Sequence, residues 1–407
     1  MKKKLRIGIL FGGRSGEHEV SLLSAASILK AIDRKKYDVV PIAISKHGQW
    51  LTGSDARGLL ASPSSPSIEA EADAEFAAAA AVLRSGEPLN IPALPPHPHV
   101  PAGLELSASA ELAHPSNPLG ESLDVIFPVL HGTFGEDGTI QGLFELADIA
   151  YVGSGVLGSS AGMDKDAMKR LFAAAGLPQT PHVTLLRSEW RADPKRSIKL
   201  IEKSLRYPVF VKPANLGSSV GISKVKQRSE LAAALDIAAS FDRKLVIEQG
   251  VGGPGAKPRE LEVSVLGNDT PEASVVGEII PNAEFYDYES KYADSPENPS
   301  IPIIPAKLSN AESKQIREMA LAAFRACDCA GLARVDFLME PAAKGKKKSK
   351  PRIYLNEINT MPGFTSISMY PKLWQASGVP YKKLIDRLID LAVERHREKQ
   401  QTQFTRS

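Results

Sequence analysis

The sequence predicts an α/β protein of several domains, the first of which is a doubly wound domain built on a parallel sheet. One reason is an unbroken apolar run at 5–11 that ends in Gly12-Gly13, as is typical of a strand buried on both faces of a sheet. The other reason is the pattern that follows this run. A polar loop extends to Glu19, apolar residues have helical spacing over 21–32, and a second strand is expected over 37–44. Together with the first strand, these elements make a β-loop-α-β unit.

The chain of 407 residues is too long for one compact domain, and we expect three. The N-terminal α/β domain, 1–155, is interrupted at about 53–120 by a segment rich in Ala, Ser and Pro with a single expected helix at 75–83. A strand at 123–130 and a helix at 140–146 then restore the α/β pattern.

A small α+β domain, 156–247, and a larger α+β domain, 248–407, are expected to follow. The expected elements of the small domain are helices at 167–175 and 229–241 and strands at 182–185, 208–212, 222–225 and 244–249. Those of the larger domain are strands at 260–266, 273–280, 331–339 and 353–357 and helices at 310–327 and 381–399.

Composition argues against several classes of partner. The 50 Lys and Arg nearly balance 47 Asp and Glu, so no overall field favours nucleic acid. The basic run at 344–350 contains no aromatic residue and is interpreted as a solvated hairpin tip. No stretch approaches the ~20 apolar residues of a membrane helix. Cys327 and Cys329 cannot form a disulfide framework or a zinc site and are expected to be buried thiols, which indicates the cytoplasm.

The loop after Lys212 has the properties of a phosphate-binding loop. A Val-Phe-Val strand ends at Lys212, and small residues follow as far as Gly221. Small side chains let backbone N–H groups close on a phosphate while the lysine supplies a positive charge. The loop is neither a Walker A nor a Rossmann sequence. A plain hairpin turn is the alternative.

Two later strands carry oxygen ligands. Alternate side chains share one face of a strand, so Arg334 and Asp336 project together, as do Glu357 and Asn359. Two carboxylates and an amide oxygen form a hard ligand set suited to Mg²⁺ that bridges nucleotide phosphates. The alternative is a pair of surface strands with solvated charges.

Lys212 with its loop, Glu248, Arg334-x-Asp336 and Glu357-x-Asn359 occur in the order and approximate spacing of ATP-grasp ligases. Further motifs narrow the resemblance to the D-alanine–D-alanine ligases of bacterial cell-wall synthesis. These motifs are Gly12 to Ser21, His131 to Gly138, Met163-Asp164-Lys165, Tyr286 to Tyr292 and Asn359 to Thr365. The resemblance covers nearly the whole chain except about 53–120, the loop 252–258 and the basic hairpin.

The resemblance implies an ATP-grasp fold and a reaction in two steps. ATP phosphorylates the carboxylate of one D-alanine, and the amine of a second D-alanine attacks the acyl phosphate. The products are D-alanyl-D-alanine, ADP and phosphate, for peptidoglycan precursors. The resemblance also implies two Mg²⁺ ions, with Mn²⁺ possible, and a homodimer.

Roles for individual residues follow from the same resemblance. Glu17 receives the ammonium of the first D-alanine, supported by Ser218 and Tyr292, with His131 nearby. Arg334 and the Gly363 N–H form an oxyanion hole, and Ser368, Met369 and Lys291 receive the second D-alanine. Asp336, Glu357 and Asn359 hold the metal ions. ATP contacts Lys165, Lys212, Ser218, Ser219, Glu248, Gln249, Val251, Glu260 and Lys291.

Other interpretations are a helix cap for Glu17 and a salt bridge to a neighbouring strand for Arg334. The segment 286–292 is expected to be a mobile lid.

One rival function is D-alanine–D-lactate ligation. Lys291-Tyr292 argues against it, because these residues match the dipeptide-forming pattern. A second rival is a nucleotide-binding protein without turnover, and the presence of Arg334, Asp336, Glu357 and Asn359 argues against it.

Overall fold

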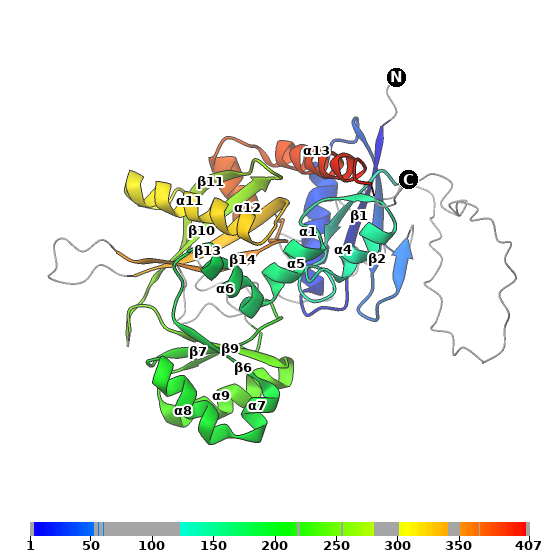
Figure 1. The fold of residues 1–407 in the computed structure, drawn as a ribbon. Coiled ribbons are helices and arrows are strands. Elements are labelled where there is room, and N and C mark those ends of the chain that lie inside the picture. Colours follow the sequence, from blue (N-terminus) through cyan, green and yellow to red (C-terminus); the bar gives the residue numbers. More distant parts are fainter. Residues whose placement is uncertain are drawn as a thin grey trace, which may run out of the picture.

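A computed structural model describes residues 4–52, 56, 60, 123–217, 220–253, 255–280, 301–340, 351–365 and 367–403. These residues form three sheets with their helices (Figure 1). Several predictions lie outside the described residues: Ser218, Ser219, Lys291, Tyr292, the lid 286–292, the basic run 344–350, the helix 75–83 and all of 53–120 except Ala56 and Leu60.

The first sheet has the order β3-β2-β1-β4-β5. Its strands are β1 (Leu5–Gly12), β2 (Tyr37–Ile44), β3 (Trp50–Thr52), β4 (Val125–Val129) and β5 (Ala150–Tyr151). All neighbouring pairs are parallel except β2 with β3. Ile9 packs in the core with α1 (His18–Ala31), whereas Leu10 packs on the opposite face with α4 (Thr139–Leu146). The doubly wound prediction is therefore confirmed.

The second sheet is antiparallel, with the order β6-β9-β7-β8. Its elements are β6 (His182–Leu186), α7 (Arg187–Ala192), α8 (Pro194–Ser204), β7 (Val209–Pro213), β8 (Ser223–Val225), α9 (Arg228–Phe241) and β9 (Lys244–Gln249). The sequence did not predict α7 and α8. α8 fully buries only Ser197 and Ile201, with Ile198 packed beside them, so its apolar stripe is short. Its start is marked by the Asp193 cap before Pro194.

The third sheet is antiparallel, with the order β12-β11-β10-β13-β14. Its strands are β10 (Arg259–Gly267), β11 (Glu272–Ile280), β12 (Ile301–Ile303), β13 (Gly331–Met339) and β14 (Ile353–Asn359). One face packs on α6 (Lys165–Ala174) and α11 (Asn310–Ala326). α12 (Met369–Ala376), which the sequence did not predict, packs against the opposite face through Leu373.

The last helix, α13 (Tyr381–Lys399), returns to the first sheet. Its Leu384 and Leu388 share a core with Ile9 of β1 and with Leu332 of β13, so the first and third sheets are packed into one body. Cys327 and Cys329 are free and buried, as expected. Among the described residues, none of the helices combines the length and apolar character needed to span a membrane.

Candidate active site

Glu17 lies at the carboxyl edge of the first sheet, where ligands of open α/β sheets usually bind. The turn that delivers it requires glycine at position 12, since φ is +92° and a Cβ there would lie 2.1 Å from the Ile44 carbonyl oxygen. α1 begins at His18, three residues earlier than predicted. Glu17 occupies the N-cap position, as the helix-cap interpretation expects, but its side chain makes no capping hydrogen bond.

The expected phosphate-binding loop lies directly against Glu17. A Cβ built on Gly217 would stand 2.6 Å from Glu17 Oε1 and 3.7 Å from Glu136 Oε1. Glu17 is only 8% exposed. A loop from the second sheet and a carboxylate from the first are therefore in direct contact.

This close approach gives a testable expectation for Gly217→Ala. The new methyl group meets Glu17 Oε1 at 2.6 Å, so the loop or the carboxylate must move. We expect kcat/KM for the amino acid substrate that the resemblance implies to fall about tenfold or more, at the scale of misplaced site groups. The control is Gly142→Ala in α4, where a Cβ meets nothing within 4 Å. Equal kinetics for the two variants would show that the loop tolerates a side chain at this position.

Glu136 is a site residue that the sequence reasoning passed over, although its motif was noted. It is buried and accepts a hydrogen bond from the Gly132 N–H at 2.9 Å. Burial, followed by the charge of Glu17, raises the pKa of Glu136 well above its usual value. The charges of Lys165 and Arg334 act on Glu136 as well, which places these residues in one electrostatic neighbourhood. Burial and the neighbouring Glu17 therefore both disfavour a second negative charge at Glu136.

His131 joins the first sheet to the loop that carries Gly363. Its Nδ1 lies 2.9 Å from the Met361 carbonyl oxygen, and its Nε2 lies 3.2 Å from Ser24 Oγ. Because a carbonyl only accepts, we assign the proton to Nδ1 and let Nε2 accept from Ser24. Burial lowers the pKa of His131, which favours this neutral form. With both ring nitrogens engaged, His131 orients the loop.

The same loop is anchored at Phe364, and it brings the predicted site residues Gly363 and Ser368 together. The Phe364 N–H donates to Ser24 Oγ at 3.2 Å, and its ring packs against Phe127, Tyr370 and Tyr381. A Cβ on Gly363 would lie 3.1 Å from Ser368 Oγ. Ser368 is the N-cap residue of α12.

Arg334, Asp336, Glu357 and Asn359 share one face of the third sheet, as predicted. Asp336 pairs with Glu357 across the strands and Arg334 pairs with Asn359. Arg334 donates to both carboxylate oxygens of Asp336 at 2.7 Å. Its Nε also lies 3.4 Å from Oε2 of Glu262 on β10, so a salt bridge to a neighbouring strand exists as well. Burial opposes the charge of Arg334, but these carboxylates raise its pKa above the usual value.

This donor set fits a divalent cation that is also bound by phosphate. The oxygens of Asp336, Glu357 and Asn359 belong to adjacent register positions on one face. In the described part of the chain, no three His, Cys, Asp or Glu side chains are grouped closely enough to hold a metal alone. Mg²⁺ usually binds to one or two carboxylates together with phosphates and water. The residues therefore fit a nucleotide-bound Mg²⁺ and not a closed protein cage.

The expected phosphate lysines lie on two different elements. Lys165, the first residue of α6, donates to the Leu216 carbonyl of the phosphate loop at 2.7 Å. Lys212 Nζ lies 3.1 Å from Glu248 Oε2. Burial raises the pKa of the Glu248 carboxyl, but Lys169 and then Lys212 outweigh it and lower this pKa to about 2.

The remaining predicted ATP residues span two sheets. Gln249 ends β9, where its Oε1 accepts from the Arg206 N–H at 2.9 Å, and Val251 follows it in a buried position. Glu260 lies on β10 of the third sheet, opposite Leu338. A nucleotide that contacts all of these residues would lie between the second and third sheets.

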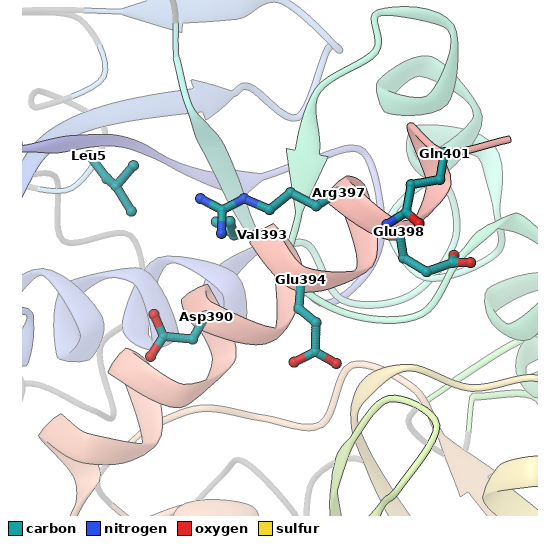
Figure 2. A pocket seen from close by; sticks show the side chains of 7 residues that line it. All are labelled: Leu5, Asp390, Val393, Glu394, Arg397, Glu398 and Gln401. Carbon is teal, nitrogen blue, oxygen red and sulfur yellow. The ribbon is translucent and has the colours of Figure 1, made fainter.

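A separate open cavity of about 560 Å³ lies between the start of β1 and α13 (Figure 2). It is lined by Leu5, Asp390, Val393, Glu394, Arg397, Glu398 and Gln401, none of which is a predicted site residue. The chemistry of the described site is therefore not located in this cavity.

Comparison with known proteins decides the family. The model of the D-ala D-ala ligase N-terminus matches residues 6–154, and that of the D-ala D-ala ligase C-terminus matches 171–390. The chain belongs to the D-alanine–D-alanine ligase family. Membership of this family makes the protein an ATP-dependent ligase with the ATP-grasp fold, as the resemblance implied.

Relatives named D-alanine–D-alanine ligase match almost end to end. The protein from Geobacillus kaustophilus is 46% identical over 402 residues, which cover 99% of this chain and 98% of the relative. The one from Heliobacterium modesticaldum is 48% identical over 397 residues, which cover 98% and 97%.

Solved structures of the family agree with this assignment. The D-alanine–D-alanine ligase of Coxiella burnetii is 35% identical with a TM-score of 0.72, over 98% of this chain and 96% of that one. The VanG D-Ala:D-Ser ligase of Enterococcus faecalis is 31% identical with a TM-score of 0.72, over 96% and 100%.

Proposed function

We propose that this protein joins two D-alanine molecules through a D-alanyl phosphate, with the roles that the resemblance assigned to its residues. The observation that carries the proposal is the position of Glu17, a buried carboxylate enclosed by the Gly217 loop next to Glu136. A buried anion beside a phosphate loop is suited to the ammonium of an amino acid whose carboxylate points at a phosphate. The family membership of the chain supports D-alanine as that amino acid.

The first step activates a carboxylate. Oxide cannot leave a carboxylate, so a carboxylate oxygen of the first D-alanine attacks the γ-phosphorus of ATP, and ADP departs with the electrons of the broken P–O bond. Lys165 and Lys212 hold the phosphates as cations, and the Gly217 loop covers them. Glu17 fixes the ammonium, which orients the attacking carboxylate.

The second step forms the peptide bond. The amine of the second D-alanine, whose carboxylate is received at Ser368 and the Met369 N–H, attacks the acyl carbon. Arg334 and the Gly363 N–H stabilise the oxyanion of the tetrahedral adduct, which collapses and releases phosphate. His131 keeps Gly363 in place through its bond to the Met361 carbonyl.

We propose Asp336, Glu357 and Asn359 as the residues that hold two Mg²⁺ ions. When bound, the ions supply charge neutralisation and a template for the phosphates. The family also supports the further proposals of a homodimer and a cytoplasmic location. Sedimentation of the purified protein at micromolar concentration would test the dimer, which a monomer mass would contradict.

Phosphate release tests the function itself. With ATP and Mg²⁺ present, we expect release with D-alanine and none with L-alanine, and a product mass equal to D-alanyl-D-alanine. D-alanine with D-lactate or with D-serine provides the comparison, since one solved neighbour is a D-Ala:D-Ser ligase. A mixed product in excess over the dipeptide would contradict the choice of second substrate. Tight ATP binding without release would contradict catalysis.

A further inference from the structure

Lys169 is a buried lysine to which the reaction assigns no role. Its side chain is fully buried, and among the described residues its amine makes no hydrogen bond of good geometry. The charge nearest to it in the structure is Glu248 Oε1, at 3.3 Å. A lysine is almost never fully buried unless it is paired, so this one requires an explanation.

The position of Lys169 follows from the stripe that α6 buries. Lys165, Met168, Lys169 and Phe172 have the i, i+3, i+4, i+7 spacing of one helix face. Met168 and Phe172 pack into the core of the third sheet, whereas Lys165 and Lys169 meet groups of the second sheet. Gln179 donates to the Lys169 carbonyl at 2.9 Å and fixes the backbone there. Lys169 therefore presents its amine to Glu248 from a rigid element.

Glu248 is shared between two lysines that differ in access. Lys169 approaches Oε1, and Lys212 approaches Oε2 at 3.1 Å. The side chain of Lys169 is 0% exposed and that of Lys212 is 11% exposed. Lys212 is therefore accessible from outside the protein, while Lys169 is not.

This sharing has an energetic consequence. A phosphate that binds Lys212 must compete with Glu248 for its amine. If Glu248 had no other cation, the departure of Lys212 would leave a buried carboxylate without compensation, which is strongly unfavourable. Lys169 removes that cost because it remains beside Glu248. With both lysines beside it, the pKa of Glu248 is lowered to about 2, which agrees with an ionised carboxylate between them.

We infer that Lys169 is a positioning residue that keeps Glu248 neutralised and so frees Lys212 to bind the phosphates of ATP. This inference rests on the proposed function, because it takes Lys212 as a phosphate ligand. Lys169 itself touches no substrate. Because Glu248 is itself an expected nucleotide contact, we expect the loss to be larger for the phosphate groups than for the nucleoside.

The test is the affinity of the full-length protein for ATP, ADP and adenosine, measured by calorimetry with Mg²⁺ present. In Lys169→Met we expect the affinity for ATP and ADP to fall about tenfold or more, and the affinity for adenosine to fall clearly less. Lys169→Arg, which keeps the charge, should restore most of the loss. Lys314→Met on the exposed face of α11 is the matched control and should bind all three ligands normally. Equal losses for ATP and adenosine, or no loss, would overturn the inference.

Two further variants keep the result decisive. Glu248→Gln in the Lys169→Met background removes the anion that retains Lys212. The ratio of ATP affinity to adenosine affinity should therefore recover in the double variant. A ratio that does not recover would overturn the inference even if Lys169→Met alone did not fold. Lys212→Met tests the proposed function separately. If Lys212→Met lowers the ratio of ATP affinity to adenosine affinity and Lys169→Met does not, only the inference about Lys169 fails. If Lys212→Met leaves this ratio unchanged, the phosphate-binding role of Lys212 and the inference about Lys169 both fail.

Discussion

Replacing Arg334 with alanine should lower kcat by about 10²–10³ while ATP affinity stays close to that of the native enzyme. This decrease in kcat is the size expected when an enzyme loses one oxyanion-hole donor in a site sheltered from water. Arg334 suits this role because it is buried, and the bidentate contact with Asp336 and the ion pair with Glu262 hold its guanidinium in one orientation. The measurement is steady-state phosphate release together with an ATP titration.

Two controls accompany this prediction, because Arg334→Ala also leaves the carboxylates of Asp336 and Glu262 without their cation. Arg334→Lys keeps the charge but not the fork, so it should fold better and still lose most of kcat. Thermal unfolding of each variant separates instability from lost chemistry. Native kcat in a folded Arg334→Ala variant would exclude Arg334 from the oxyanion hole.

Glu17→Gln should reduce kcat/KM for the first D-alanine by about 10²–10³, the cost of an unpaired charge in a buried site. Glu17 is 8% exposed and faces the Gly217 loop, so water cannot replace the lost carboxylate. ATP affinity should change little, since no nucleotide contact is assigned to Glu17. The measurement is kcat/KM at varied D-alanine and saturating ATP.

Glu19→Gln is the matched control for this variant, two residues along the chain. Glu19 pairs with Lys46 at the surface, where the side chains are 29% and 58% exposed. Surface pairs contribute little, so kcat/KM should stay within about twofold of the native value. If both variants had similar kinetics, Glu17 would not be the residue that binds the ammonium.

The comparison of sequence and structure shows which signals could be read locally. β13 and α13 were predicted with the bounds that the structure has, because an apolar strand and a long amphipathic helix carry strong periodic signals. α7, α8 and α12 were missed because each is short or buries few apolar side chains. Glu136 and Lys169 were not selected from the sequence for another reason. Their buried positions beside Glu17 and Glu248 depend on residues that lie far from them in sequence.

The sequence by itself determined the fold class, the family and the residue types of the site, since these depend on local periodicity and on motifs. Only the tertiary structure decided which side chains meet. β14 shows this clearly, because strict alternation would place Glu357 on the core face with Leu355. A bulge between the paired strands shifts the register, so Leu355 and Ile358 enter the core while Glu357 and Asn359 face Asp336 and Arg334. Packing of distant elements, which no local pattern encodes, also brings the Gly217 loop onto Glu17 and Lys169 onto Glu248.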